Sequence, residues 1–157
     1  MPDVNPIPSN YRRITPGLAV EGAADAIAFY VEVFGAVERM RTPGPDGSIA
    51  HAEIQIGDSV LMVDDASPMM GTKAPPKEGL DGSPVTLYVY VEDVDAAISR
   101  AVELGATLKR PATDQFYGDR NGWIIDPFGH GWTVASHVED VSGEEMERRM
   151  REMMGAG

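Results

Sequence analysis

The sequence predicts an α+β protein made of two tandem β-α-β-β-β modules followed by a C-terminal helix. One observation is an internal repeat, in which residues 18–36 (LAVEGAADAIAFYVEVFGA) align with residues 89–106 (VYVEDVDAAISRAVELGA). The offset is 71, so that Val20 aligns with Val91, and one single-residue gap falls near Phe34. The other observation is that each copy combines short runs of period two with one segment of helical period. Repetition and alternation together predict two copies of one structural unit.

The first module begins with a predicted strand over residues 15–20, where apolar residues alternate up to a Val-Glu pair. Asp25 follows near a helix start, where the helix dipole favours negative charge. Apolar residues then recur at helical spacing as far as Phe34, and Gly35 is typical of a helix end. Turns at 43–47 and at Gly57-Asp58 separate three further predicted strands, over residues 37–42, 48–56 and 59–63.

The second module repeats this order. Residues 85–91 predict a strand, and Asp93 and Asp95 mark the start of a helix that ends at Gly105. Three more strands are predicted over residues 107–110, 121–125 and 131–136, with a DPFGH turn at 126–130.

The remaining segments set the expected domain organisation. Residues 64–84 are rich in Pro, Gly and Met, which predicts a linker or a lid that carries Met69 and Met70. Residues 142–154 predict a third, amphipathic helix, because Ser142 and Glu145 have the spacing of a capping box and four Met fall on one stripe. We therefore expect an N-terminal extension, a first module, a linker or lid loop, a second module and a C-terminal helix, at 1–11, 12–64, 65–84, 85–138 and 139–157.

Composition excludes several classes of function. Lys and Arg number 13 against 25 Asp and Glu, and the net charge of −12 argues against nucleic acid or an anionic membrane as a partner. The absence of cysteine excludes disulfides, thiolate nucleophiles and cysteine-based metal sites. No apolar run is long enough to cross a membrane, and residues 1–13 lack the layout of a signal peptide, so we expect a cytoplasmic protein.

The paired modules, the helix ending AFYVEVFGA and the DPFGH turn resemble the vicinal-oxygen-chelate superfamily of glyoxalase I, bleomycin-resistance proteins and extradiol dioxygenases. HAEIQIGDSVLMV and DQFYGDRNGWIIDPFGH are similar to its PhnB-like, glyoxalase-like group. The resemblance covers about residues 12–138. It implies that the modules form curled mixed sheets around a pocket, and that the protein is a homodimer.

Enzymes of that superfamily hold a divalent metal through four His, Glu or Gln side chains. The resemblance places the four ligand positions at Thr15, Met62, Thr86 and Thr133. Hydroxyls and a thioether do not replace the N and O donors that such an ion needs. We therefore expect no metal and no other cofactor.

Strand alternation selects the expected pocket residues. The mixed polar and aromatic face of the strands, opposite the aliphatic face, carries Thr15, His51, Glu53, Gln55, Met62, Thr86, Tyr88, Tyr90 and Thr133. Phe116 and Tyr117 lie in a glycine-containing loop that could cap a planar ligand, or else pack locally beside an Asp119–Arg120 surface pair. Trp123 and Trp132 are expected to face the helices, and His137 the surface.

These residues favour a metal-free protein that binds a small aromatic or cationic molecule between its modules, for sequestration or resistance. Whether it catalyses a reaction stays open. One alternative is a metal-dependent lyase, isomerase or dioxygenase of the same superfamily. Another is a metal-free acid–base enzyme using His51 and Glu53, whose side chains point the same way from one strand. An interaction module that acts through the acidic surface and the Met-striped helix is the fourth hypothesis.

Overall fold

The computed structural model describes residues 4–76 and 83–155, and it divides the chain into two compact units, Met1–Asp81 and Gly82–Gly157. Each unit contains one β-α-β-β-β module and one mixed four-stranded sheet. The predicted α+β class with two tandem modules is confirmed. Parts of the expected extension, linker and C-terminal segment (1–3, 77–82, 156–157) lie outside the described residues.

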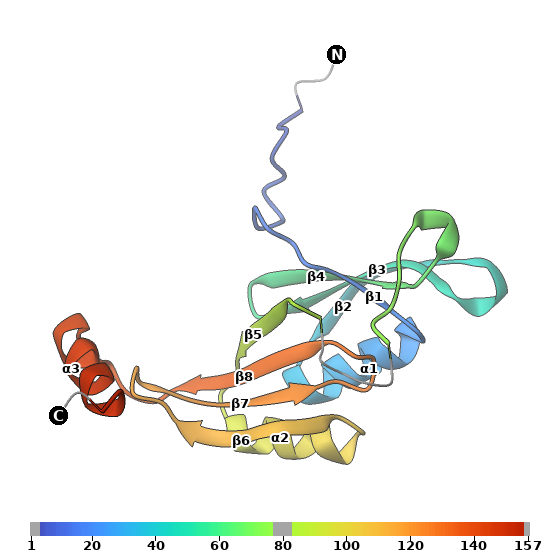
Figure 1. Ribbon diagram of the computed structural model, residues 1–157. Helices are drawn as coiled ribbons and strands as arrows, with labels where there is room; N and C mark the ends of the chain where they lie inside the picture. The colour runs from blue at the N-terminus through green and yellow to red at the C-terminus, as the bar shows by residue number, and fades with distance from the viewer. Residues whose placement is uncertain (1–3, 77–82, 156–157) are drawn as a thin grey trace. The chain divides into compact units, whose positions relative to one another are not determined.

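The first module runs in the order β1 (Gly17–Val20), α1 (Ala23–Phe34), β2 (Val37–Pro43), β3 (Ile49–Ile56) and β4 (Ser59–Asp65), with short 3-10 turns at Pro45–Gly47 and Pro68–Met70. Its sheet has the order β1-β4-β3-β2, in which β1 pairs in parallel with β4 and the other neighbours are antiparallel (Figure 1).

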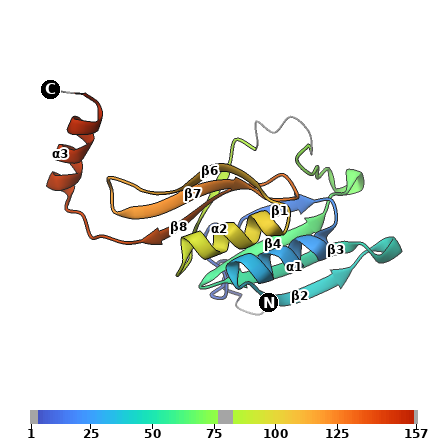
Figure 2. The same ribbon diagram turned by 90° about the horizontal axis from the view of Figure 1, so that it is seen from below.

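The second module repeats the topology with β5 (Thr86–Tyr90), α2 (Val94–Glu103), β6 (Thr107–Asp114), β7 (Asp119–Ile125) and β8 (Gly131–His137). The sheet order is β5-β8-β7-β6, again with one parallel pair between the first and the last strand. A last helix, α3 (Gly143–Met153), follows β8 and lies off the end of this sheet in both views (Figures 1 and 2).

Local sequence explains where the helices begin and end. Gly35 adopts φ of 66° at the end of α1, and its N–H and that of Ala36 bond back to the carbonyls of Val31 and Tyr30, as in a left-handed helix cap. The Asp93 side chain accepts a hydrogen bond from the N–H of Ala96 at the start of α2, and Ser142 does the same for Glu145 at the start of α3. Glu145 itself binds arginines rather than closing a capping box.

Helices α1 and α2 each pack on one face of the sheet of their own module, and the other face of that sheet carries no helix of the same module. In the first module Ile54, Leu61 and Val63 are buried together with Ile27 and Tyr30 of α1. In the second module a Cβ at Gly122 would lie 2.5 Å from the Cδ1 of Ile98, which places Gly122 directly under α2. Odd-numbered β7 residues, next to Gly122, therefore project from the helix-free face.

Strand ends differ from the predictions by two or more residues at four places, of which one is the end of β4 at Asp65 instead of residue 63. β1 begins at Gly17, so Thr15 precedes the strand, and its hydroxyl donates to the carbonyl of Arg12. β7 begins at Asp119, two residues earlier than expected, and β6 extends to Asp114 through two register shifts. Among the described residues, no helix is both long and apolar enough to cross a bilayer.

Candidate functional site

The helix-free face of the second sheet carries a connected set of polar and aromatic side chains, which we call the Asp119 cluster. Strand register brings Tyr88 next to Thr133, and Thr133 next to Trp123, across this face. The members of the cluster are Tyr88, Tyr90, Arg110, Tyr117, Asp119, Asn121 and His137.

Asp119 is a buried carboxylate, only 4% exposed. Its Oδ2 accepts hydrogen bonds from the hydroxyls of Tyr88 (2.9 Å) and Tyr90 (2.8 Å), and its Oδ1 lies 2.9 Å from Nδ1 of His137. A buried charge is tolerated where donors surround it, and here three donors converge on one carboxylate.

Asn121 connects this carboxylate to the rest of the face. The Nδ2 atom of Asn121 donates to the hydroxyls of Tyr88 (2.9 Å) and Tyr117 (2.7 Å), while its Oδ1 accepts from Nη2 of Arg110 (2.8 Å). Both the oxygen and the nitrogen of this buried amide therefore have hydrogen-bond partners. The positions of the Tyr88 and Tyr117 rings and of the Arg110 guanidinium depend on these bonds.

Protonation states follow from these contacts. Burial works to raise the pKa of Asp119, but the hydrogen bonds from His137, Tyr90 and Tyr88 outweigh it, so the pKa is lowered and the carboxylate stays ionised. Burial and the bond to Asp119 raise the pKa of Tyr88, and the bond to Asp119 raises that of Tyr90. The bonds to Asp119 and Asp140 raise the pKa of His137. Both tyrosines therefore remain neutral donors.

Tyr88 and Tyr90 are held at their hydroxyl ends and remain exposed to solvent. Tyr88 is 46% and Tyr90 60% exposed, and their ring centroids are 5.3 Å apart at an interplanar angle of 46°. Phe116 and Tyr117 form a second aromatic pair, with centroids 5.2 Å apart in an edge-to-face arrangement. Tyr117 is tied to the same cluster through Asn121. Accessible, immobilised aromatic rings are a typical surface for binding planar molecules.

The helix-free face of the first sheet carries a second polar set, which we call the Glu53 cluster: Tyr11, Arg39, His51, Glu53 and Asp64. Glu53 is buried, and its Oε1 accepts from the hydroxyl of Tyr11 (2.6 Å) and lies 3.5 Å from Nε2 of His51. The other ring nitrogen, Nδ1 of His51, lies 2.9 Å from Oδ1 of Asp64. The Arg39 guanidinium lies over the Tyr11 ring at 5.3 Å and 3.8 Å from Oε2 of Glu53.

The remaining predicted site residues join neither cluster through a side-chain hydrogen bond that the structure shows. Gln55 donates to the carbonyl of Gly57, Met62 is half-buried beside Glu53 in the strand register, and Thr86 is exposed. Thr133 lies on the same face as Tyr88, and Phe116 is half-buried.

Two sequence interpretations are wrong. Asp119 does not form a surface pair with Arg120, because Arg120 points to the other face and binds Asp95 and Asp114. Trp123 does not face α2: it is paired with Thr133 on the helix-free face, whereas Trp132 is buried on the helix side as expected.

Sequence reasoning also missed Arg110, Asn121, Asp64 and Tyr11, and it assigned His137 to the surface. His137 is half exposed, yet both ring nitrogens have carboxylate partners. The signal that Asp119, Asn121 and Trp123 share a face was their successive spacing of two residues along one strand.

The donor set at the four superfamily ligand positions does not fit a divalent metal. Thr15 lies outside its strand with its hydroxyl bonded to a backbone carbonyl, and Met62, Thr86 and Thr133 offer a thioether and two neutral hydroxyls. Over residues 4–76 and 83–155, no group of three or more His, Asp or Glu side chains has an arrangement suited to a metal ion.

Two βαβββ modules, each with a mixed sheet and one open face, define the glyoxalase-like class of fold. The family model described as the Glyoxalase/Bleomycin resistance protein/Dioxygenase superfamily matches residues 13–134, and the chain belongs to this superfamily.

Among curated relatives, an uncharacterized protein of Mycobacterium tuberculosis, Rv0887c, is 44% identical over 138 residues, which span 87% of this chain and 81% of that protein. The uncharacterized protein At5g48480 of Arabidopsis thaliana is 29% identical over 130 residues, spanning 78% of this chain and 76% of its own.

Solved structures show the same fold. TioX from Micromonospora sp. ML1 has a TM-score of 0.59 at 26% identity, covering 83% of this chain and 100% of that one. The PhnB protein from Bacillus cereus, described as a putative 3-demethylubiquinone-9 3-methyltransferase, has a TM-score of 0.61 at 20% identity over 80% of this chain and 99% of its own, which is a likeness of fold alone.

Proposed function

We propose that this protein binds a small planar aromatic molecule, with a preference for cations, on the helix-free face of its second module, and that it acts by sequestration rather than through a metal centre. One observation carries the proposal: Tyr88 and Tyr90 are held at their hydroxyls by buried Asp119, yet both residues remain exposed. Rings fixed in advance lose little conformational entropy when a ligand stacks on them.

Charge supports the preference for a cation. The chain has a net charge of −12, which raises the local concentration of cations, and the faces of aromatic rings attract them. Arg110 is already bonded to Asn121, so its charge is directed to the sheet rather than to the ring faces. The description of the superfamily names a resistance protein beside enzymes, which supports a role other than catalysis for this chain.

The test is calorimetric titration with three probes: proflavine, a planar aromatic cation; 2-naphthoate, a planar aromatic anion; and putrescine, a cation without a ring. We expect proflavine to bind more tightly than either of the others. The variant Y88A/Y90A should lose at least tenfold in proflavine affinity, while Y11A, which removes a tyrosine of the Glu53 cluster, should bind as the wild type does. Equal proflavine affinity in Y88A/Y90A and Y11A would refute the proposal.

A second candidate function is metal-free acid–base chemistry at His51. The observation that favours it is the bond between Nδ1 of His51 and Asp64, since a carboxylate on one ring nitrogen orients the other for proton transfer. General-base elimination of 5-nitrobenzisoxazole tests this function without a known substrate. H51A should abolish the elimination activity and H137A should retain it. Equal elimination rates in H51A and H137A would exclude His51 as the general base.

A further inference from the structure

The turn between β6 and β7 carries two rings that are joined to the pair formed by Tyr88 and Tyr90. Phe116 and Tyr117 lie at the corner of this turn. The hydroxyls of Tyr117 and Tyr88 both accept a hydrogen bond from Nδ2 of Asn121, at 2.7 and 2.9 Å. Because one buried amide holds both hydroxyls, the two aromatic pairs lie next to each other in the second module.

The segment after β8 packs directly against the backbone of this turn. A hydrogen bond from the N–H of Gly118 to the carbonyl of Gln115 (3.1 Å) closes the turn. The carbonyl of Gly118 accepts from the N–H groups of Val138 (2.9 Å) and Glu139 (3.0 Å). Gly118 is buried with φ of 99°, and a Cβ there would overlap the carbonyl oxygen of Glu139. The turn and residues 138–139 therefore form one closely packed unit.

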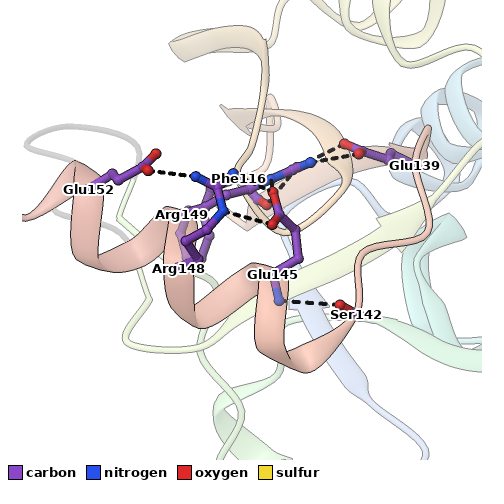
Figure 3. Close-up of polar contacts among 7 residues, drawn as sticks. All are labelled: Phe116, Glu139, Ser142, Glu145, Arg148, Arg149 and Glu152. Atoms are coloured by element: carbon purple, nitrogen blue, oxygen red, sulfur yellow. Dashed lines mark hydrogen bonds and ion pairs between the residues drawn. The ribbon is translucent and has the colours of Figure 1, made fainter.

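Arg149 of α3 binds both parts of this unit (Figure 3). Its Nη1 atom donates to the carbonyl of Phe116 (3.3 Å), and Nη1 and Nη2 donate to the two carboxylate oxygens of Glu139 (2.9 and 2.7 Å). Nε of Arg149 donates to Glu145 within the helix (2.7 Å). A guanidinium presents its donors in a rigid planar fork, so this one side chain holds the turn, the segment after β8 and its own helix in a fixed relation.

The neighbouring arginine, Arg148, provides a comparison within the same helix. Among the residues that the structure describes, its side chain is bonded to Glu145 and Glu152, both of which belong to α3 (Figure 3). The Arg148 side chain is 52% exposed, against 27% for Arg149. None of the described residues of α3 is buried, so the helix is held by contacts such as those of Arg149 rather than by a buried apolar face.

We propose that Arg149 is a positioning residue of the aromatic site: by holding the carbonyl of Phe116 from α3, it keeps the Phe116 ring in place as a second stacking surface beside Tyr88 and Tyr90. This inference rests on the proposed function, since it concerns the affinity of the same site for a planar aromatic cation. A turn that is ordered before the ligand arrives loses less conformational entropy on binding. Attachment of the C-terminal helix therefore regulates the affinity of the site, and detachment of α3 lowers it.

A double-mutant cycle with proflavine as the probe tests the effect on affinity. In calorimetric titration R149Q should weaken proflavine binding about fivefold, the cost of ordering one or two side chains on binding, whereas R148Q should bind as the wild type does. F116A removes the ring but keeps the carbonyl that Arg149 binds, and it should weaken binding at least as much as R149Q. In the F116A background R149Q should therefore change the affinity by less than about twofold. An equal loss from R149Q in both backgrounds, or equal affinities of R149Q and R148Q, would overturn the proposal.

Hydrogen exchange in the free protein tests the positioning without a ligand. R149Q should accelerate exchange of the Gly118 and Glu139 amides at least about threefold, and R148Q should not. Amides of β7 should exchange at the wild-type rate in both variants, which shows that both are folded. Unchanged exchange at Gly118 and Glu139 in R149Q would overturn the proposal.

The variants also separate this inference from the proposed function. Weaker proflavine binding by Y88A/Y90A without any loss in R149Q would refute the role of Arg149 and leave the proposed function standing. If proflavine did not bind the wild type, or if Y88A/Y90A bound it normally, the proposed function would fail and the regulation by Arg149 with it.

Discussion

Asp119 and His137 lie directly opposite each other on β7 and β8, with Oδ1 of Asp119 2.9 Å from Nδ1 of His137. The other nitrogen of the ring, Nε2, lies 2.8 Å from Oδ1 of Asp140. A ring between two carboxylates is most stable as an imidazolium, and these two contacts raise the pKa of His137. A positive charge on His137 therefore helps to stabilise the ionised carboxylate of Asp119, which holds the hydroxyls of Tyr88 and Tyr90.

This raised pKa predicts a pH dependence of stability. A group whose pKa is raised by folding stabilises the protein below its unfolded pKa, about 6.5 for His, and that contribution is lost as pH rises through the folded pKa. The free energy of unfolding should therefore carry a component that is full at pH 6 and declines above neutrality. Urea titrations at pH 6 and pH 9 measure it. H137Q should lack this component, and an unchanged difference between the two pH values in H137Q would contradict the assignment.

Removal of Asp119 should be costly. D119A removes the buried carboxylate that accepts from the hydroxyls of Tyr88 and Tyr90 and is one of the two carboxylate partners of His137, and we expect a loss of about 3 kcal/mol in the free energy of unfolding. D114A is the control, because Asp114 is exposed and its side chain is shown bonded to Arg120 alone among residues 4–76 and 83–155, so its loss should be within about 0.5 kcal/mol. If D119A and D114A lost similar amounts of unfolding free energy, the hydrogen bonds of Asp119 would not stabilise this face of the sheet.

Gly122 is required by the close approach of α2 and β6. A Cβ at this position would lie 2.9 Å from the carbonyl oxygen of Arg110 and 3.0 Å from the amide nitrogen of Ala112, in addition to Ile98. Backbone atoms cannot yield without distorting the strand, so G122A should cost about 3 kcal/mol in chemical denaturation. G17A should be nearly neutral, because a Cβ at Gly17 meets nothing within 4 Å. A neutral G122A would mean that β6 can shift freely.

The two tryptophans should respond differently to replacement by phenylalanine. Nε1 of Trp132 donates to Oδ2 of Asp126 at 2.8 Å, whereas Nε1 of Trp123 is buried with no hydrogen-bond partner among the described residues. W132F breaks a buried bond to a carboxylate and should cost about 2 kcal/mol. W123F removes an unsatisfied donor and should cost less than W132F. Thermal melts of the two variants followed by far-UV circular dichroism measure the difference, and equal losses would contradict these contacts.

The fold could be predicted because the signals for its helices, strands and turns lie in short segments of sequence, and because these segments occur twice. The copy at 89–106 confirms the reading of 18–36, and turn residues such as Gly35 and Gly57 mark the ends of elements in the sequence itself. The topology required the family resemblance, because the parallel partner of β1 is distant in sequence.

The site was predicted only in part. Alternation placed Tyr88 and Tyr90 on the correct face, because β5 keeps a regular period of two. The role of Asp119 was missed because this residue precedes an arginine in a segment whose composition is typical of a loop. The face of Trp123 was assigned wrongly because two isoleucines follow it, so the sequence there does not alternate between apolar and polar residues. Contacts such as Asp64 with His51 join strands whose register the sequence does not specify.

The parallel pairing of β1 with β4 has a consequence for synthesis on the ribosome. In its sheet β1 pairs only with β4, the last strand of the module, so β1 has no strand neighbour until the residues up to Asp65 have been translated. The same delay recurs between Thr86 and His137 in the second half. In each half the pairing of the first strand therefore comes last, and a nascent chain that pauses before either closing strand presents an unpaired strand edge to chaperones.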